Sequence, residues 1–483
     1  MNKTIRRASV FTLLLVLALL VRATWVQFYE GQALAESKNN RRNVIEQYAY
    51  PLGNIIVAGD AITGSTQTTG GDLKYKRTYT DGSLYAAVTG YSSQVYGATQ
   101  LEGIYQELLD GTDNRLKGPL DTVTGERAGP GDVVTTIDPD VQKAAYEALG
   151  DKKGAAVAID PKTGRILGVV STPSYDPSVL SAGDADAWKK LTKDPEKPMT
   201  NRALRQPLPP GSTFKLVVAA AALEDGLYSS VDTRTASQDP YTLPGTTRVL
   251  ENESKSAPCE NASIRVALQY SCNNVFAKMA VDLGQDKLKA MAEKFGFNDE
   301  TQDMPVRAYE SVYPSDMDRS STALTGIGQF NVTATPLQMA MVSAAIANGG
   351  KLVSPHMVSQ ISDADGDVLE NYDDSTDTKE IVSSSTAEQL QSAMQTVVEE
   401  GTGTNARISG ATVGGKTGTA QHGENNSQTP YAWFTSYAKD DSSGKEVAVA
   451  VVVEQSDAAR SEVSGNGLAA PVAKAMMRAA LQN

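Results

Sequence analysis

The stretch PPGSTFKLVVAAAALEDG, residues 209–226, contains one residue that does not fit its surroundings. After Pro-Pro-Gly it has the pattern of a helix that is apolar on all sides, and such a helix is normally buried. Lys215 nevertheless falls in the first turn of this helix, three residues after Ser212. Because residues three apart on a helix share a face, the sequence predicts an ammonium group beside a hydroxyl in an apolar setting.

This pair can be explained as a nucleophile and its base. A serine is a weak nucleophile until a base accepts its proton, and the chain has only two histidines for that task. A lysine can be the base if burial and a second cation lower its pKa from the ordinary value of about 10.4. The amide of Ser212, at the start of the helix, could also bind a developing oxyanion. The alternative is a helix-capping serine beside a lysine that reaches solvent, and the pair alone does not decide between them.

Two further short motifs follow in the chain. Ser271-Cys272-Asn273 falls inside a predicted helical stretch, and Lys416-Thr417-Gly418-Thr419 falls on a predicted strand. Each of the three patterns also occurs elsewhere. The other Ser-x-x-Lys pairs fall in or after a predicted strand and in a charged loop, and the other Lys-Thr-Gly falls in a predicted hairpin turn. Only one combination, with one occurrence of each motif, gives the order Ser-x-x-Lys, Ser-x-Asn, Lys-Thr-Gly and places each motif on a fitting helix or strand. The other occurrences are Ser436/Lys439, Ser442/Lys445, 37–39, 464–466 and 162–164.

The elements around these motifs predict an α+β domain. A strand is followed by Asp138-Pro139, which opens an amphipathic helix, and residues 154–171 have the pattern of a hairpin. Thr335 and Pro336 open another helix. Strands at both ends of a region whose middle is helical indicate an antiparallel sheet with a helical subdomain. Helical stretches are predicted at 262–284, 333–350 and 470–481, and strands at 411–421, 431–439 and 446–456.

Residues 31–135 form a mixed module of short strands and Gly-, Thr- and Ser-rich turns. No cluster of residues in it suggests chemistry, so we interpret it as a non-catalytic structural or docking domain. The predicted division is therefore a cytoplasmic tip and anchor at 1–30, this module at 31–135, and a catalytic domain at 136–483.

The N-terminus predicts a membrane anchor. Three basic residues precede an apolar run at 10–21, and residues 8–28 are long enough to span a bilayer if Arg22 reaches the interface. A cleaved signal peptide is the alternative, with its candidate site at 33–35 well beyond the apolar run. We favour the anchor, and both readings export the rest of the chain.

Composition excludes several classes of function. The 483 residues carry a net charge of −13, which argues against binding nucleic acid because such binding needs basic clusters. Two histidines and no Cys/His cluster argue against a zinc site, and no metal or cofactor is predicted. Cys259 and Cys272 could form one disulfide in an exported protein or remain two buried thiols.

The three motifs, in this order, resemble those of the penicilloyl-serine transferases, which include penicillin-binding proteins and serine β-lactamases. The stretches around them are similar to class B penicillin-binding proteins of the penicillin-binding protein A type, and the likeness covers nearly the whole chain. One departure is Leu52, where the resemblance leads us to expect arginine before Gly53. The stretches that carry the likeness are 90–111, 159–178, 201–215, 326–350 and 397–406.

The resemblance implies a role for each motif residue. Ser212 would be the acylated nucleophile and Lys215 its base, while Ser271 would relay protons and Asn273 would orient Lys215 and the substrate amide. The strand motif would bind the carboxylate of the donor and complete the oxyanion hole. Its members are Lys416, Thr417, Gly418 and Thr419.

The implied function is a peptidoglycan D,D-transpeptidase that crosslinks stem peptides outside the membrane, releases D-Ala and is acylated by β-lactams. Its partners would be a D-Ala-D-Ala donor, an amine acceptor, the membrane and a cell-wall synthesis or division machinery. Two alternatives remain. The first is a D,D-carboxypeptidase or β-lactamase-type hydrolase, and the second is a non-catalytic β-lactam sensor or division scaffold.

Overall fold

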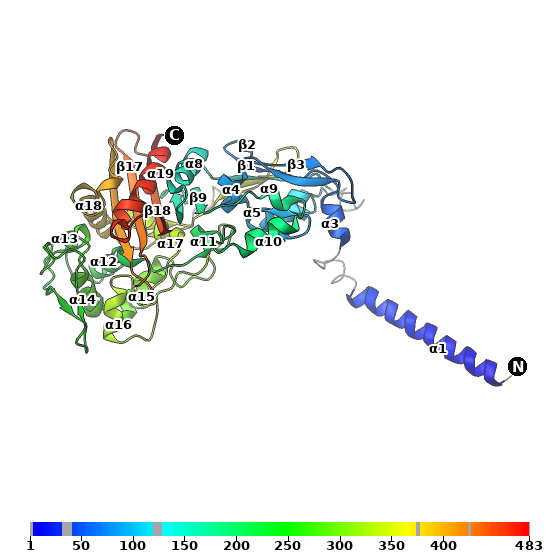
Figure 1. Cartoon of the computed structure of the whole chain (residues 1–483), viewed down its shortest axis with the longest axis horizontal. Coiled ribbons are helices and arrows are strands. Elements are labelled where there is room, and N and C mark those ends of the chain that lie inside the picture. Colours follow the sequence, from blue (N-terminus) through cyan, green and yellow to red (C-terminus); the bar gives the residue numbers. More distant parts are fainter. Residues whose placement is uncertain (1–2, 31–40, 119–127, 373–376, 424–426, 483) are drawn as a thin grey trace.

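The computed structural model describes a long N-terminal helix, a mixed α/β module and a larger α+β region (Figure 1). The described residues are 3–30, 41–118, 128–372, 377–423 and 427–482.

The larger region is built on a five-stranded antiparallel sheet in the order β16-β17-β18-β8-β9. The first two strands in sequence form the predicted hairpin, and the other three come from the end of the chain. Residues from opposite ends of the sequence therefore meet in the middle of one sheet. The strands are β8 (Lys153–Ile159), β9 (Ile166–Thr172), β16 (Ala411–Ala420), β17 (Tyr431–Asp440) and β18 (Glu446–Gln455).

Helices cover both faces of this sheet, and β18 shows why. Its residues alternate, so that Val449 belongs to the buried cluster that contains α8 (Pro139–Leu149) and α19 (Ala470–Gln482), while Ala450 belongs to the cluster that contains α17 (Pro336–Ala347). A strand buried on both faces reads as a continuous apolar run, as VAVAVVV does here.

The helix starts predicted from capping residues are confirmed. Asp138 caps α8 by accepting hydrogen bonds from the amides of Asp140 and Val141, and Thr335 caps α17 by accepting from the amide of Gln338. The helical subdomain beside the sheet consists of α12 (Lys215–Glu224), α13 (Ile264–Gln269), α14 (Asn273–Leu283), α15 (Gln285–Lys294), α16 (Arg319–Thr325) and α18 (Ser384–Glu400).

Two helix predictions need correction. The stretch 262–284, predicted as one helix, is interrupted between α13 and α14, because Ser271 has a left-handed φ of 59° that no helix can continue through. The buried helix, predicted to start at Ser212, begins with a 3-10 turn (Gly211–Phe214), and regular α-helix starts only at Lys215.

The mixed module contains a second five-stranded sheet, in the order β14-β13-β7-β1-β2. Its central pair, β1 and β7, is parallel, and the hairpin β13–β14 joins it from far along the chain. Leu52, just before this sheet, is buried in the module. The strands are β1 (Ile55–Val57), β2 (Asp60–Ala61), β7 (Asp132–Thr135), β13 (Val358–Ser362) and β14 (Val368–Asn371).

The same module buries an ion pair. Arg77 on β4 (Tyr75–Tyr79) donates to Glu102 on α5 (Gln100–Ile104) at 2.6 Å, and the two side chains are 0% and 1% exposed. Its guanidinium also donates to the carbonyl oxygen of Gly53 at 2.6 Å. A guanidinium from β4 therefore binds next to the position where the resemblance led us to expect an arginine.

The N-terminal helix α1 (Lys3–Trp25) continues as a π-helical turn (Val26–Glu30) and extends away from the rest of the chain (Figure 1). Among the described residues it is the one helix long and apolar enough to cross a membrane. Arg22, expected to reach the interface, forms an exposed ion pair with Glu30 at 2.9 Å.

Candidate active site

Ser212 lies on the 3-10 turn that precedes α12, and only 6% of its surface is exposed. The turn is held by a hydrogen bond from the hydroxyl of Thr213 to the carbonyl of Pro210. Gly328 packs against it so closely that a Cβ there would lie 2.0 Å from the carbonyl oxygen of Gly211. The serine is thus carried by a rigid turn with no room for movement on that side.

Lys215 is completely buried in the first turn of α12. Its Nζ lies 2.7 Å from the carbonyl oxygen of Ser271 and 2.9 Å from Oδ1 of Asn273, with the Ser271 hydroxyl at 3.2 Å. All three partners are neutral oxygens. Burial, followed by the charge of Lys416, lowers the pKa of Lys215 well below its ordinary value.

Lys416 on β16 is the second buried lysine of the site. Its Nζ donates to the hydroxyl of Ser271 at 3.0 Å and to the carbonyl of Thr417 at 2.9 Å. Burial lowers its pKa to about 7, and attraction to Glu253 acts in the opposite direction. The hydroxyl of Ser271 therefore lies between the amino groups of Lys215 and Lys416, where it can relay a proton.

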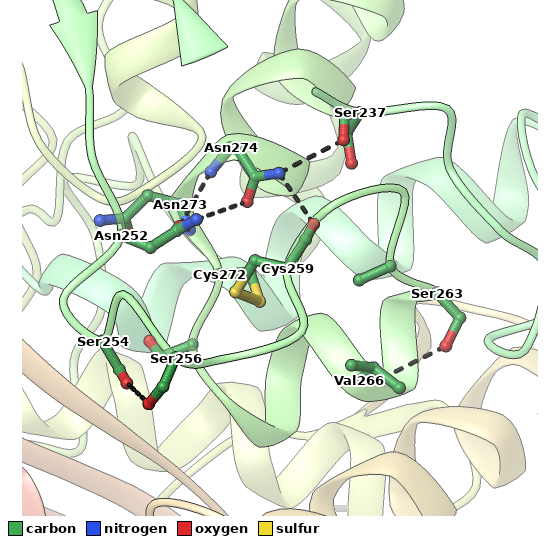
Figure 2. Close-up of a disulfide and its surroundings, with 12 residues drawn as sticks. Ser237, Asn252, Ser254, Ser256, Cys259, Ser263, Val266, Cys272, Asn273 and Asn274 are labelled. Atoms are coloured by element: carbon green, nitrogen blue, oxygen red, sulfur yellow. Dashed lines mark hydrogen bonds between the residues drawn. A yellow bond between two sulfur atoms is a disulfide. The ribbon is translucent and has the colours of Figure 1, made fainter. Parts of the chain in front are cut away.

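The left-handed turn at Ser271 positions the second motif. It aims both the carbonyl and the hydroxyl of Ser271 at Lys215, which a continuous helix would not allow. Next to it, the Cys259–Cys272 disulfide ties this turn to the preceding loop (Figure 2). The sequence left open a disulfide or two buried thiols, and the structure contains the disulfide.

The third motif lies on β16 beside the nucleophile turn. Thr417 exchanges a hydrogen bond with the hydroxyl of Thr402 at 2.8 Å. A Cβ on Gly418 would lie 2.9 Å from the carbonyl oxygen of Pro210, so this glycine lets the strand approach the turn of Ser212. The sequence also suggests that a glycine here keeps a Cβ out of the way of a substrate strand, and that role stays a prediction. Thr419 is half-buried on the same strand.

The structure therefore joins residues from all three motifs. Hydrogen bonds link Lys215, Ser271, Asn273 and Lys416 directly. The other Ser-x-x-Lys pairs lie elsewhere: Ser436 is buried on β17 with its hydroxyl on a backbone carbonyl, and Ser442 bonds to Asp440 in a turn. Residues 37–39 lie outside the described residues, and Gly465 of the other Ser-x-Asn pattern packs against the backbone of Gly418. Such an arrangement can hold one lysine neutral beside a nucleophile while a second binds an anion.

Sequence reasoning missed two supporting residues. Asn252 accepts a hydrogen bond from the amide of Asn273 at 2.5 Å and donates to the side chain of Asn274 at 3.1 Å, as Figure 2 shows. Glu253, its neighbour, is the carboxylate that attracts both buried lysines. The stretch ENES that contains them has no pattern of its own, so no signal in the sequence could have found them.

Comparisons with known proteins agree with this geometry. Residues 154–478 match the family described as penicillin binding protein transpeptidase domain, and residues 52–133 match the penicillin binding protein A dimerisation domain. The chain is 37% identical to the peptidoglycan D,D-transpeptidase PbpA of Mycolicibacterium smegmatis over 499 aligned positions, covering 100% of this chain and 99% of that protein.

Solved structures give the same result. The ceftriaxone acyl-enzyme complex of penicillin-binding protein A from Mycobacterium tuberculosis matches with a TM-score of 0.83 and 35% identity, covering 91% of this chain and 100% of that one. The penicillin G acyl-enzyme complex of the same protein matches with a TM-score of 0.80 and 36% identity, covering 89% and 99%. This chain therefore belongs to the penicillin-binding protein transpeptidase family and is of the penicillin-binding protein A type.

Proposed function

We propose that this protein is a peptidoglycan D,D-transpeptidase that crosslinks stem peptides through an acyl-enzyme on Ser212 and is blocked by β-lactams acylating the same serine. The observation that carries this proposal is the position of Lys215. Its ammonium group is buried without a carboxylate partner, is bound by neutral oxygens of Ser271 and Asn273, and lies one turn from Ser212. Burial and the charge of Lys416 lower the pKa of Lys215 well below its ordinary value, which favours the neutral amine that can accept a proton.

In the first half-reaction, the hydroxyl of Ser212 gives its proton to Lys215 as its oxygen attacks the carbonyl carbon between the two D-alanines. Two N–H groups of the neutral amine bond to Ser271 and Asn273, which leaves its lone pair to take this proton. When the C–N bond breaks, the proton passes through the hydroxyl of Ser271 to the leaving nitrogen. D-alanine departs, and an ester on Ser212 remains.

In the second half-reaction, the amine of a neighbouring stem peptide attacks this ester. Its nitrogen bonds to the acyl carbon, and a proton from the nitrogen goes to Lys215. That proton returns to the oxygen of Ser212 as the ester bond breaks, so the free enzyme is regenerated. The exchange of one amide for another needs no cofactor.

Lys416 and Thr417 bind the carboxylate of the donor, while the amides of Ser212 and Thr419 stabilise the oxyanion. Three features support these roles. The cationic form of Lys416 has no carboxylate among its hydrogen-bond partners, Thr417 lies on the same strand, and Gly418 brings that strand against the nucleophile turn.

We also propose that the protein is a single-pass protein of the bacterial cell membrane, with its catalytic domain on the extracytoplasmic side. The apolar helix α1, the basic residues before it and the disulfide support this placement. The division into an anchor at 1–30, a non-catalytic domain at 31–135 and a transpeptidase domain at 136–483 is part of the proposal, with the hairpin β13–β14 adding to the second part. We also propose recruitment by a cell-wall synthesis or division machinery.

Mass spectrometry of the protein incubated with labelled penicillin tests the assignment. The wild type should gain one penicilloyl group on the peptide that contains Ser212, and Ser212→Ala should gain none while keeping its unfolding temperature. Ser436→Ala and Ser442→Ala are matched controls that should still be acylated, since each removes a serine from another Ser-x-x-Lys pattern. An adduct that persists on Ser212→Ala would overturn the nucleophile.

A further inference from the structure

The loop between β11 (Val249–Leu250) and Cys259 is fastened at both ends beside the active site. Near its start, Asn252 binds the amide of Asn273, and the side chain of Asn273 donates to the carbonyl of Glu251 at 3.0 Å. At its other end, the disulfide joins Cys259 to the residue between Ser271 and Asn273. Figure 2 shows the hydrogen bonds of Asn252 and the disulfide of Cys259. The loop is thus held in place over the second motif.

Glu253 follows Asn252 directly and therefore shares this fixed position. Its side chain is exposed, and none of the described lysines or arginines forms an ion pair with it. Its charge nevertheless reaches both Lys215 and Lys416, which are fully buried. A solvated carboxylate thus stands at the rim of a site whose interior carries cationic groups.

The second half-reaction indicates a role for the carboxylate of Glu253. An aliphatic amine is an ammonium ion near pH 7 and arrives at the site as a cation. Lys416, and Lys215 whenever it holds a proton, repel a cation that approaches the ester on Ser212. The donor, in contrast, brings a carboxylate, which these lysines attract. A negative group at the rim therefore favours the acceptor and disfavours the donor.

We propose that Glu253 binds the ammonium group of the acceptor at the rim of the site before the amine attacks the acyl-enzyme. This inference rests on the proposed transpeptidase function and deepens it by assigning an acceptor subsite. The chemical class that fits is a primary ammonium at the end of a flexible side chain or peptide branch, because such a group can contact an exposed carboxylate, release one proton to water and then move to the ester as the free amine.

The test separates the two half-reactions in the full-length protein. Penicillin acylation measures the first, and an ester donor partitioned between water and added glycinamide measures the second. Glu253→Gln should raise the KM for glycinamide about threefold to fivefold, the range expected when a solvent-exposed charge pair is lost. The same variant should be acylated by penicillin at close to the wild-type rate, because two small effects oppose each other: the repulsion of an anionic donor is removed, whereas the pKa of Lys416 loses the support of the Glu253 charge.

Glu260→Gln is the matched control: it removes an exposed carboxylate just beyond the end of the loop, next to Cys259, and should change neither rate. Glu253→Asp should restore most of the acceptor affinity. In the wild type, the KM for glycinamide should rise between low and high salt, and in Glu253→Gln it should rise less. If Glu253 had only a structural role, its replacement would also change the rate of penicillin acylation, and its effect on the KM for glycinamide would not depend on salt.

The outcomes distinguish this inference from the function on which it rests. If the wild type is acylated by penicillin but transfers no acyl group to glycinamide, both the transpeptidase function and the acceptor subsite fail. If transfer occurs with the same KM in Glu253→Gln and the wild type, only the acceptor subsite fails. Loss of penicillin acylation in Glu253→Gln would also overturn it, since the residue would then act on the first half-reaction.

Discussion

The two halves of this molecule bury charge in opposite ways. In the N-terminal module, Arg77 is paired at 2.6 Å with Glu102, and both are inaccessible to solvent. At the active site, Lys215 and Lys416 are equally buried, but their hydrogen-bond partners are neutral oxygens. Burial lowers the pKa of both lysines, and the charge of Lys416 lowers that of Lys215 further. The ion pair of Arg77 and Glu102 stays charged, whereas the two lysines of the active site favour the loss of one charge.

The difference separates structure from chemistry. A buried ion pair is costly to break, because the partner left behind is an uncompensated charge. A buried cation without a counter-charge instead becomes neutral at a pH where it would normally be protonated, and a neutral amine is a base. Burial alone therefore does not mark a functional residue in this chain. The absence of a counter-charge does.

The largest effect should come from restoring a permanent charge at the base. Lys215→Arg should lower the rate of penicillin acylation by about 10²- to 10⁴-fold, the usual contribution of a general base, because a guanidinium cannot be neutral near pH 7. Stopped-flow or gel assays with a fluorescent penicillin measure this rate.

Lys439→Arg is the control for that prediction, since Lys439 is exposed and belongs to another Ser-x-x-Lys pattern; its acylation should be unchanged. Unfolding curves must show that Lys215→Arg is folded. Acylation of a folded Lys215→Arg at the wild-type rate would mean that this lysine is not the base.

The second effect concerns the paired charges. Arg77→Met should lower the free energy of unfolding by about 3–5 kcal/mol, because Glu102 stays buried without its partner. The double variant Arg77→Met/Glu102→Leu should recover most of that loss. Urea unfolding measures both, and folded protein of either variant should still be acylated by penicillin. A double variant no more stable than the single one would show that the ion pair is not what Arg77 contributes.

The sequence predicted the active site better than the folding around it. Ser212, Lys215 and Lys416 were identifiable because a lysine in an apolar helix, and the order of three motifs, are visible along the chain. The break at Ser271 was not, because its helix-forming neighbours conceal a left-handed residue that is fixed by the disulfide and by Asn252. Contacts between distant segments leave no local pattern.

The N-terminal module shows the same limit. Its short strands and turns were visible in the sequence, but the addition of β13–β14 to its sheet depends on pairing with β7 across more than 200 residues. The sequence also could not explain why Leu52 stands where the resemblance led us to expect an arginine. The guanidinium that binds the carbonyl of Gly53 comes from Arg77, on another strand, and only the fold brings it there.

The third effect concerns the disulfide that fixes the turn of Ser271. Removing it in Cys259→Ser/Cys272→Ser should cost about 3 kcal/mol of stability, since the bond closes a short loop across a separation of 13 residues. Thermal unfolding measures the loss, and acylation by penicillin should slow because Ser271 and Asn273 become less fixed. Two thiols titrating in denatured wild type, purified without reductant, would contradict the presence of the bond.

The smallest effect is the pH dependence of the unpaired cation. Burial lowers the pKa of Lys416 to about 7, so the free enzyme loses this positive charge as pH rises through neutrality. The charge attracts the carboxylate of penicillin, and the second-order rate constant of acylation reports the free enzyme. On the alkaline limb, above this pKa, the rate constant should therefore fall about tenfold for each further pH unit, which corresponds to about 1.4 kcal/mol.

Lys416→Arg, which keeps its charge, should lose this alkaline limb even if its overall rate is lower. A wild-type rate that stays flat from pH 7 to 9 would mean that the charge on Lys416 is not needed, and the contrast between paired and unpaired buried cations would then rest on Lys215 alone.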